Sequence, residues 1–206
     1  EGYFMSKFVF PPSIRSRPTY GILERREGTF HIIIAEDEGA EAVIEFVGSD
    51  KNFLKKAHII FVTTKSGEKY VSRLEALTSA QFYVGPTYSA SVQRLQKVLE
   101  AAKMGSQFYL TGTEGFMGQA QNEIMKAGFP HTAIQTEHRG SVARRMQCVH
   151  CKGITEDVLT DPFVCGHCGL NLFVRDHYSR RLAAYQGVRV DAEDHGNVPE
   201  PVELYT

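Results

Sequence analysis

The chain has 206 residues, of which 42% are hydrophobic and 23% are charged. These values are typical of globular proteins, so they exclude a wholly disordered chain and allow one large domain or a medium domain with a small addition. The formal net charge of −1 gives no broad positive field for nucleic acid, and no apolar run approaches the roughly 18 residues of a membrane-spanning helix. We therefore expect a soluble cytoplasmic protein that contacts no membrane.

Charge is distributed unevenly along the chain. Residues 139–181 carry seven Lys or Arg against four Asp or Glu, whereas residues 191–206 carry five acidic side chains and no Lys or Arg. A basic segment and an acidic tail of this size suit a protein partner better than nucleic acid. Together with the patterns described below, the composition predicts four regions: an irregular arm at 1–30, a body at 31–140, a cysteine-containing ribbon with a basic segment at 141–190, and an extended acidic tail at 191–206.

The body shows short apolar runs that alternate with helical patterns. Before it, Pro11, Pro12 and Pro18 predict that the arm forms no helix. The expected strands are 31–35, 57–62, 80–84, 107–111 and 132–136. This alternation predicts an α/β fold, with a parallel sheet that is covered by helices on both faces.

The expected helices follow the strands. One spans 39–47, a short one lies near 73–77, one ends at Gly105, and one ends at Gly128. For the helix that ends at Gly105, Ser89 or Ser91 is the expected N-cap, because a hydroxyl oxygen can accept from a backbone N–H of the first turn.

Ligands of parallel sheets bind at the carboxyl ends of the strands, near the point where the strand order reverses. Gly112, Thr113 and Glu114 follow the fourth strand and are the candidate cofactor-binding residues; the alternative is that the glycine only forms the turn into the next helix. The loop after the first strand, 36–38, carries three acidic side chains that would repel a pyrophosphate. We find no Ser/His/Asp arrangement, HExxH motif or Walker loop, so no catalytic residues are predicted.

All four cysteines fall within a short segment and form two CxxC pairs, Cys148 with Cys151 and Cys165 with Cys168. Two such pairs supply the four thiolates of a tetrahedral metal site, so the spacing predicts a zinc ribbon in which the metal stabilises the fold. Rubredoxin-type iron uses the same four thiolates, and dithiol exchange at the second pair is a third interpretation.

Basic and aromatic residues crowd the segment after the cysteines. The candidate partner-binding residues are Arg175, His177, Tyr178, Arg180 and Arg181. Such a cluster suits an acidic protein surface; contact with nucleic acid, with the chain's own acidic tail, or with solvent alone are the alternatives.

Two resemblances to known families follow from these motifs. Residues 31–138 resemble the NAD(P)-binding domain of ferredoxin reductases, chiefly in the segments 108–117 and 133–137. The two CxxC pairs and the long segment 174–188, VRDHYSRRLAAYQGV, resemble the small A subunit (DmmA-like family) of bacterial dimethylamine monooxygenase. The fold that the resemblances imply is a ferredoxin-reductase-like nucleotide-binding domain with a C-terminal zinc ribbon.

The second resemblance also implies a function. It implies a subunit of a multi-subunit, NADPH-dependent enzyme that oxidises dimethylamine to methylamine and formaldehyde. NADPH, FMN, an iron–sulfur cluster, haem and tetrahydrofolate would then belong to the assembly, mainly on a haem subunit and a flavin and iron–sulfur reductase subunit. This chain is expected to be non-catalytic and to organise or assist electron transfer between them. The alternatives are a zinc-ribbon protein that binds nucleic acid and an autonomous rubredoxin-like electron carrier.

Overall fold

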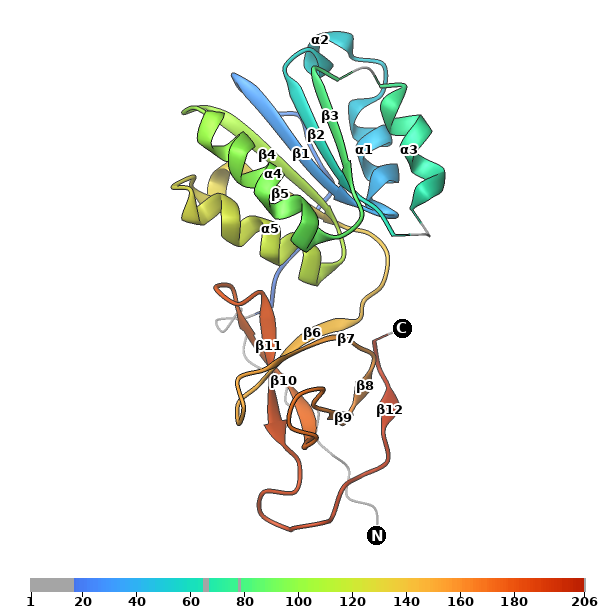
Figure 1. Ribbon diagram of the computed structural model, residues 1–206, viewed down its shortest axis with the longest axis vertical. Helices are drawn as coiled ribbons and strands as arrows, with labels where there is room; N and C mark the ends of the chain where they lie inside the picture. The colour runs from blue at the N-terminus through green and yellow to red at the C-terminus, as the bar shows by residue number, and fades with distance from the viewer. Residues whose placement is uncertain (1–16, 65–66, 78, 206) are drawn as a thin grey trace.

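A computed structural model of the chain describes residues 17–64, 67–77 and 79–205, so Pro11 and Pro12 of the expected arm lie outside the described residues. The first of its sheets is entirely parallel and has the strand order β3-β2-β1-β4-β5 (Figure 1). Its strands are β1 (Phe30–Glu36), β2 (Ala57–Val62), β3 (Gln81–Gly85), β4 (Ser106–Gly112) and β5 (Ile134–His138). The α/β fold with a parallel sheet is confirmed.

Helices cover both faces of this sheet. The helices are α1 (Gly39–Val47), α2 (Lys51–Leu54), α3 (Glu68–Glu75), α4 (Tyr88–Ala101) and α5 (Glu114–Lys126), with the short 3-10 helix η1 (His131–Ala133) before β5. Figure 1 shows α1 and α3 on one side of the sheet and α4 and α5 on the other. The strand order reverses between β1 and β4, as it does in doubly wound sheets.

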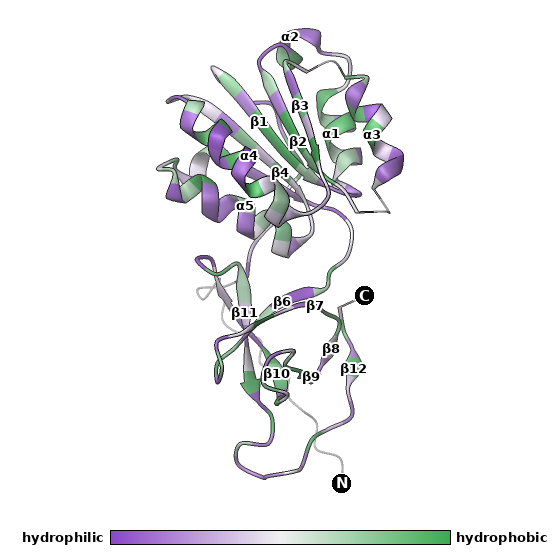
Figure 2. Cartoon of the chain, in the orientation of Figure 1, coloured by the Kyte–Doolittle hydropathy of each residue, from purple (hydrophilic) through white to green (hydrophobic). Residues whose placement is uncertain are grey.

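Two hydrophobic cores follow from this layering. In β1, Ile33 and Ala35 belong to the core beneath α1 and α3, whereas Ile32 and Ile34 belong to the core beneath α4 and α5. Successive side chains of a strand point to opposite faces, so a strand that is covered on both faces is mainly apolar. Figure 2 shows the hydrophobic colour along β1 and β2. The unbroken apolar run therefore predicted a buried strand correctly.

The expected N-cap of α4 is wrong. Thr87 is the cap, and its Oγ1 accepts a hydrogen bond from Ala90 N at 3.2 Å. Ser91 is already inside the helix, where its Oγ donates to Thr87 O at 2.8 Å. The sequence Thr87-Tyr88-Ser89 contains several hydroxyl groups. The backbone path of the turn after β3 determines which of these residues occupies the N-cap position of α4.

Other boundaries also differ from expectation. α4 ends at Ala101 and not at Gly105, and β5 begins at Ile134 because η1 occupies the preceding residues. The short helix α2 was not expected; it forms because Asp50 Oδ1 accepts from Asn52 N at 2.9 Å and from Phe53 N at 3.0 Å. These differences arise from local capping, which the hydrophobic pattern does not report.

Beyond the parallel sheet, the described residues form strands and no helices. The second sheet has the order β7-β6-β11-β10-β9 and consists of β6 (Arg144–Cys148), β7 (Ile154–Val158), β9 (Phe163–Val164), β10 (Asn171–Ser179) and β11 (Ala184–Arg189). We call residues 144–189 the ribbon. The tail is not extended throughout, because Asn197 N donates to Asp194 O in a turn and β12 (Val202–Glu203) pairs with β8 (Thr160–Asp161).

The arm, here residues 17–29, contains neither helix nor strand but is held against both sheets. Gly21 N donates to Thr136 O of β5 at 3.0 Å, and Leu23 N donates to the carboxylate of Glu137 at 2.8 Å. At its start, Arg17 forms an ion pair with Asp176 of the ribbon. The arm therefore connects the outer edge of the parallel sheet to the ribbon.

Candidate functional site

The four cysteine sulfurs of the ribbon meet in one cluster, in which all Sγ atoms lie within 4.8 Å of one another. The Sγ atoms of Cys148 and Cys168 are 3.9 Å apart, and those of Cys151 and Cys165 are 3.7 Å apart. A tetrahedral metal with metal–sulfur bonds of about 2.3 Å holds its ligands about 3.8 Å apart, whereas a disulfide needs about 2 Å. The cluster therefore has the geometry that a tetrahedral metal ion requires.

A tight backbone turn positions the first CxxC pair at the end of β6. Cys148 N donates to Gly153 O, and Lys152 N donates to Cys148 O, both at 2.9 Å. Gly153 N in turn donates to the Sγ atom of Cys151 at 3.4 Å. A side chain at Gly153 would overlap the ring of His167, because a Cβ there would lie 2.5 Å from it. The turn thus directs a backbone N–H at a sulfur, as metal-binding knuckles do.

The pKa values of the clustered cysteines also favour a bound cation. Burial raises the pKa of Cys165, but the backbone N–H groups of Cys168 and His167 outweigh it, so that this pKa is lowered to about 6. At Cys168 the backbone N–H of Leu170 acts to lower the pKa, but burial and the three neighbouring cysteines raise it to about 12. Ionisation of one sulfur thus opposes ionisation of the next, and a cation among them would remove that opposition.

The carboxyl ends of β1 and β4 meet where the strand order reverses, and Gly112, Thr113 and Glu114 lie together at this point. Glu36, the last residue of β1, lies beside these three residues. Its Oε2 accepts from Thr113 N at 3.2 Å and from Thr113 Oγ1 at 2.6 Å. Burial raises the pKa of the Glu36 carboxyl, although the hydrogen bonds from Thr113 act to lower it. The N-terminus of α5 therefore faces a carboxyl group that belongs to the chain itself.

The backbone around this position is closely packed. A Cβ atom at Gly39, in the first turn of α1, would lie 2.5 Å from Thr111 O. At Gly112, where φ is +141°, a Cβ atom would lie 2.8 Å from the Cβ of Glu36. A phosphate at the candidate cofactor residues would have to displace the Glu36 carboxyl. Nucleotide binding by Gly112, Thr113 and Glu114 stays a prediction.

Glu114 joins three parts of the molecule. Its Oε2 accepts from the hydroxyl of Tyr20 in the arm at 2.7 Å and from the hydroxyl of Tyr185 in β11 at 3.2 Å. Burial, followed by the charge of Glu114, raises the pKa of both phenols, so both remain hydrogen-bond donors. Sequence reasoning missed this contact, because no local pattern links residues that are separated by 94 and 71 positions.

Of the candidate partner-binding residues, four are exposed and one, Tyr178, is half-buried. Arg175 and His177 are exposed on β10. Tyr178 is half-buried: its ring lies 5.0 Å from that of Tyr185, and a Cβ at Gly118 of α5 would overlap its hydroxyl. Tyr178 is therefore a contact between the ribbon and the body.

Arg180 and Arg181 lie in the turn after β10, and both are exposed. The backbone carbonyl of Arg181 accepts from Asn122 Nδ2 of α5 at 2.8 Å, which fixes the turn against the body. The two adjacent side chains differ in surroundings, since Arg180 lines a cavity whose lining does not include Arg181.

Both halves of the chain match one protein family. Residues 12–134 match the N-terminal domain, and residues 145–188 the C-terminal domain, of the dimethylamine monooxygenase subunit DmmA-like proteins. The chain belongs to the dimethylamine monooxygenase subunit DmmA-like family. This DmmA-like chain is 32% identical over 99 residues to the heme-dependent oxidative N-demethylase delta subunit of Ectopseudomonas mendocina (strain ymp). That match covers 48% of the chain and 57% of the relative's length.

Similar solved structures include reductases. Phthalate dioxygenase reductase is 11% identical to the DmmA-like chain, with a TM-score of 0.45. The match covers 67% of the DmmA-like chain and 46% of the reductase. The flavohem-like FAD/NAD binding domain of nitric oxide dioxygenase from Vibrio cholerae O1 biovar El Tor is 16% identical, with a TM-score of 0.42. This match covers 60% of the DmmA-like chain and 56% of the domain. The fold class rests on the strand order itself. Among the described residues, no helix is both long and apolar enough to cross a membrane.

Proposed function

We propose that the chain is a non-catalytic subunit of an oxidative N-demethylase that acts on dimethylamine. The observation that carries this proposal is that the parallel-sheet body and the cysteine ribbon both match the DmmA-like family. The relative from Ectopseudomonas mendocina, a delta subunit of a heme-dependent oxidative N-demethylase, supports membership of such an assembly.

In this proposal the assembly converts dimethylamine, O₂, NADPH and a proton into methylamine, formaldehyde, water and NADP⁺. One N-methyl carbon is oxidised, NADPH supplies two electrons, and O₂ is divided between formaldehyde and water. The four cysteines of the chain are all in the cluster, so none remains for an iron–sulfur cluster. We assign haem, FMN, the iron–sulfur cluster, tetrahydrofolate and the NADPH site mainly to partner subunits.

The four-sulfur cluster takes a structural zinc ion in this proposal. Cys148, Cys151, Cys165 and Cys168 would hold the metal, which would tie β6 to the turn before β10. Metal analysis and a visible spectrum of the purified chain test the assignment. We expect one zinc per chain and no visible colour. Stoichiometric iron, with a red colour that bleaches on reduction, would instead favour the rubredoxin-like carrier.

The exposed face of β10 is the proposed contact with a partner subunit. Arg175 and His177 alternate with half-buried residues, and the neighbouring Phe173 and Val164 have exposed fractions of 40% and 60%. Exposed apolar side chains beside cationic ones suit an acidic partner surface with an apolar centre. The ribbon would then position the electron-delivering and haem-bearing subunits relative to each other.

Co-expression with the candidate partner subunits tests the function and the contact separately. We expect the subunits to co-purify and dimethylamine to cause NADPH oxidation. Absence of both results would contradict the function. Arg175→Glu should weaken co-purification, whereas Lys97→Glu, the same charge change on the exposed face of α4, should not. Equal effects of the two variants would reject only the contact at β10.

A further inference from the structure

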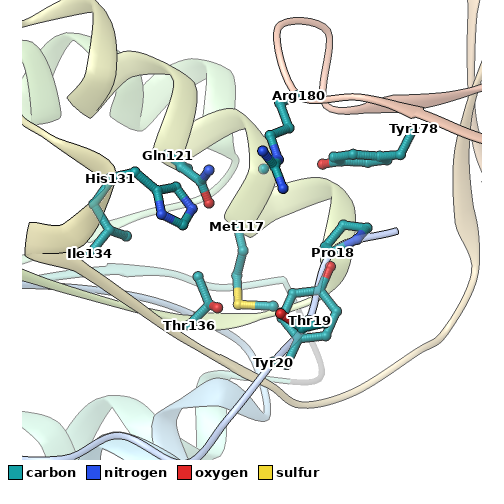
Figure 3. A pocket seen from close by; sticks show the side chains of 11 residues that line it. Pro18, Thr19, Tyr20, Met117, Gln121, His131, Ile134, Thr136, Tyr178 and Arg180 are labelled. Atoms are coloured by element: carbon teal, nitrogen blue, oxygen red, sulfur yellow. The ribbon is translucent and has the colours of Figure 1, made fainter. Parts of the chain in front are cut away.

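A small cavity lies where the arm, α5, β5 and the turn after β10 meet, and Figure 3 shows the side chains around it. Its volume is about 80 Å³. One water molecule needs roughly 10–15 Å³ of such space, so the cavity admits a small polyatomic ligand. Met117 and Ile134 supply apolar lining, and polar groups from separate segments complete the walls.

Arg180 is the charged side chain of the cavity lining, which contains no Asp or Glu. Behind the lining, the hydroxyl of Tyr20 donates to the carboxylate of Glu114 at 2.7 Å. Figure 3 shows the guanidinium of Arg180 directed toward the space between Gln121 and Tyr178. Within the described part of the chain, the Arg180 side chain forms no ion pair and no hydrogen bond.

Several other arginines of the molecule have carboxylate partners. Arg144 pairs with Asp176 at 2.8 Å, and Arg189 pairs with Asp191 at 2.7 Å. Arg180 therefore differs from them in facing a cavity and not a carboxylate of the chain. A guanidinium in that position lacks the anion that its planar set of donors fits.

Further donors surround the guanidinium. Tyr178 is held as a neutral phenol, because burial and then the charge of Glu114 raise its pKa, whereas Arg145 and Arg180 act to lower it. Gln121 contributes an amide from α5, and His131 contributes an imidazole from η1. A guanidinium with a phenol, an amide and an imidazole around one small space is an arrangement that can bind a carboxylate or phosphate group.

We propose that this cavity binds a small oxyanion, either a carboxylate or inorganic phosphate, with Arg180 as its charged anchor. The walls belong to the arm, the body and the ribbon, so the bound anion would link these three parts. The proposal stands independently of the proposed role in N-demethylation, because it concerns only groups within this chain.

Titration of the full-length, metal-loaded chain with acetate and with inorganic phosphate tests the proposal, at constant ionic strength maintained with chloride. We expect at least one of the two anions to bind saturably by calorimetry and to raise the melting temperature. Binding of acetate alone identifies a carboxylate site, and binding of phosphate alone identifies a phosphate site. If neither anion binds saturably, the proposal is wrong.

Matched variants locate the site. Arg180→Gln should weaken binding at least tenfold, whereas Arg181→Gln, which changes the adjacent exposed arginine outside the cavity, should bind as the unmodified chain does. Arg180→Lys keeps the charge but loses the planar donors, so we expect intermediate affinity. Metal content and melting temperature without anion verify that the variants are folded. Equal affinity of Arg180→Gln and Arg181→Gln would overturn the assignment of Arg180.

Discussion

Glu36 shows how one side chain changes what a parallel sheet can bind. The N-terminus of a helix favours negative charge, and in doubly wound sheets this position commonly faces a phosphate. Here the Glu36 carboxyl accepts both hydrogen bonds that Thr113 offers at the start of α5. The free-energy cost of burying the carboxyl is thus offset by two donors and by the helix terminus.

Removal of this acceptor should destabilise the body. Glu36→Ala leaves Thr113 N without its partner, and we expect the free energy of unfolding to fall by about 1–3 kcal/mol. Glu36→Gln keeps an oxygen that can accept a hydrogen bond from Thr113, so its free energy of unfolding should fall by less. Denaturant unfolding of both variants measures the difference, and equal losses would show that the hydrogen bonds to Thr113 contribute little.

A second prediction concerns a buried histidine of β2. Burial, followed by the charge of Arg94, lowers the pKa of His58 to about 4. In the unfolded chain this histidine binds a proton near pH 6.5. The contribution of neutral His58 to the free energy of unfolding is therefore fully present above that pH and is lost as pH falls toward 4. Each pKa unit corresponds to about 1.4 kcal/mol. His58→Gln should flatten the decline in unfolding free energy between pH 7 and pH 5, and an unchanged slope would contradict this.

At the scale of elements, the sequence was most informative where one physical cause dominates. Burial on both faces makes β1 and β2 mainly apolar, so the runs beginning at Ile32 and Ile59 identify strands even though His31 and His58 precede them. Two CxxC pairs identify a four-sulfur cluster because so few residues can serve as soft ligands. The cap at Thr87 was missed, since the choice among neighbouring hydroxyls depends on how the chain leaves β3.

The proposed metal should matter more to the stability of the ribbon than to that of the body. Its core is small, and Cys148 and Cys165 are themselves part of it. We expect chelation, or Cys151→Ser, to increase amide hydrogen exchange across residues 146–188 while β1, β2 and β4 remain protected. A chelated chain whose ribbon amides stay protected would show that the metal is dispensable for this fold.

At the scale of the whole molecule, the contact between body and ribbon depends on a glycine. A Cβ at Gly118 of α5 would overlap the Tyr178 hydroxyl and lie 2.8 Å from the Cβ of Ala183. Gly115, on the same helix, has its nearest neighbour at 3.4 Å, the Cβ of Arg145. Substitution by alanine therefore creates a steric conflict at Gly118 but not at Gly115.

Gly118→Ala should cost about 1–3 kcal/mol of unfolding free energy, because the ribbon must move away from α5. Gly115→Ala should be neutral or stabilise by up to about 1 kcal/mol, since alanine is the better helix former. Denaturant unfolding compares them directly. Equal shifts in the two variants would mean that the body and ribbon do not need this close approach.

Long-range organisation is what the sequence could not provide. The carboxylate of Glu114 brings Tyr20 and Tyr185 together, and the cavity beside Arg180 draws its walls from segments that are distant along the chain. Neither feature leaves a periodic pattern or a fixed spacing. Both depend on how two independently patterned sheets pack, which only the three-dimensional structure reveals.

The arm along β5 has a consequence for self-association. An unpaired edge strand presents backbone groups that can template strands from other copies. Gly21 N donates to the backbone carbonyl of Thr136 in β5, Leu23 N donates to the carboxylate of Glu137, and the buried side chain of Leu23 anchors the arm there. We therefore expect edge-to-edge association of the parallel sheet to be less favourable at β5 than at its opposite edge, β3.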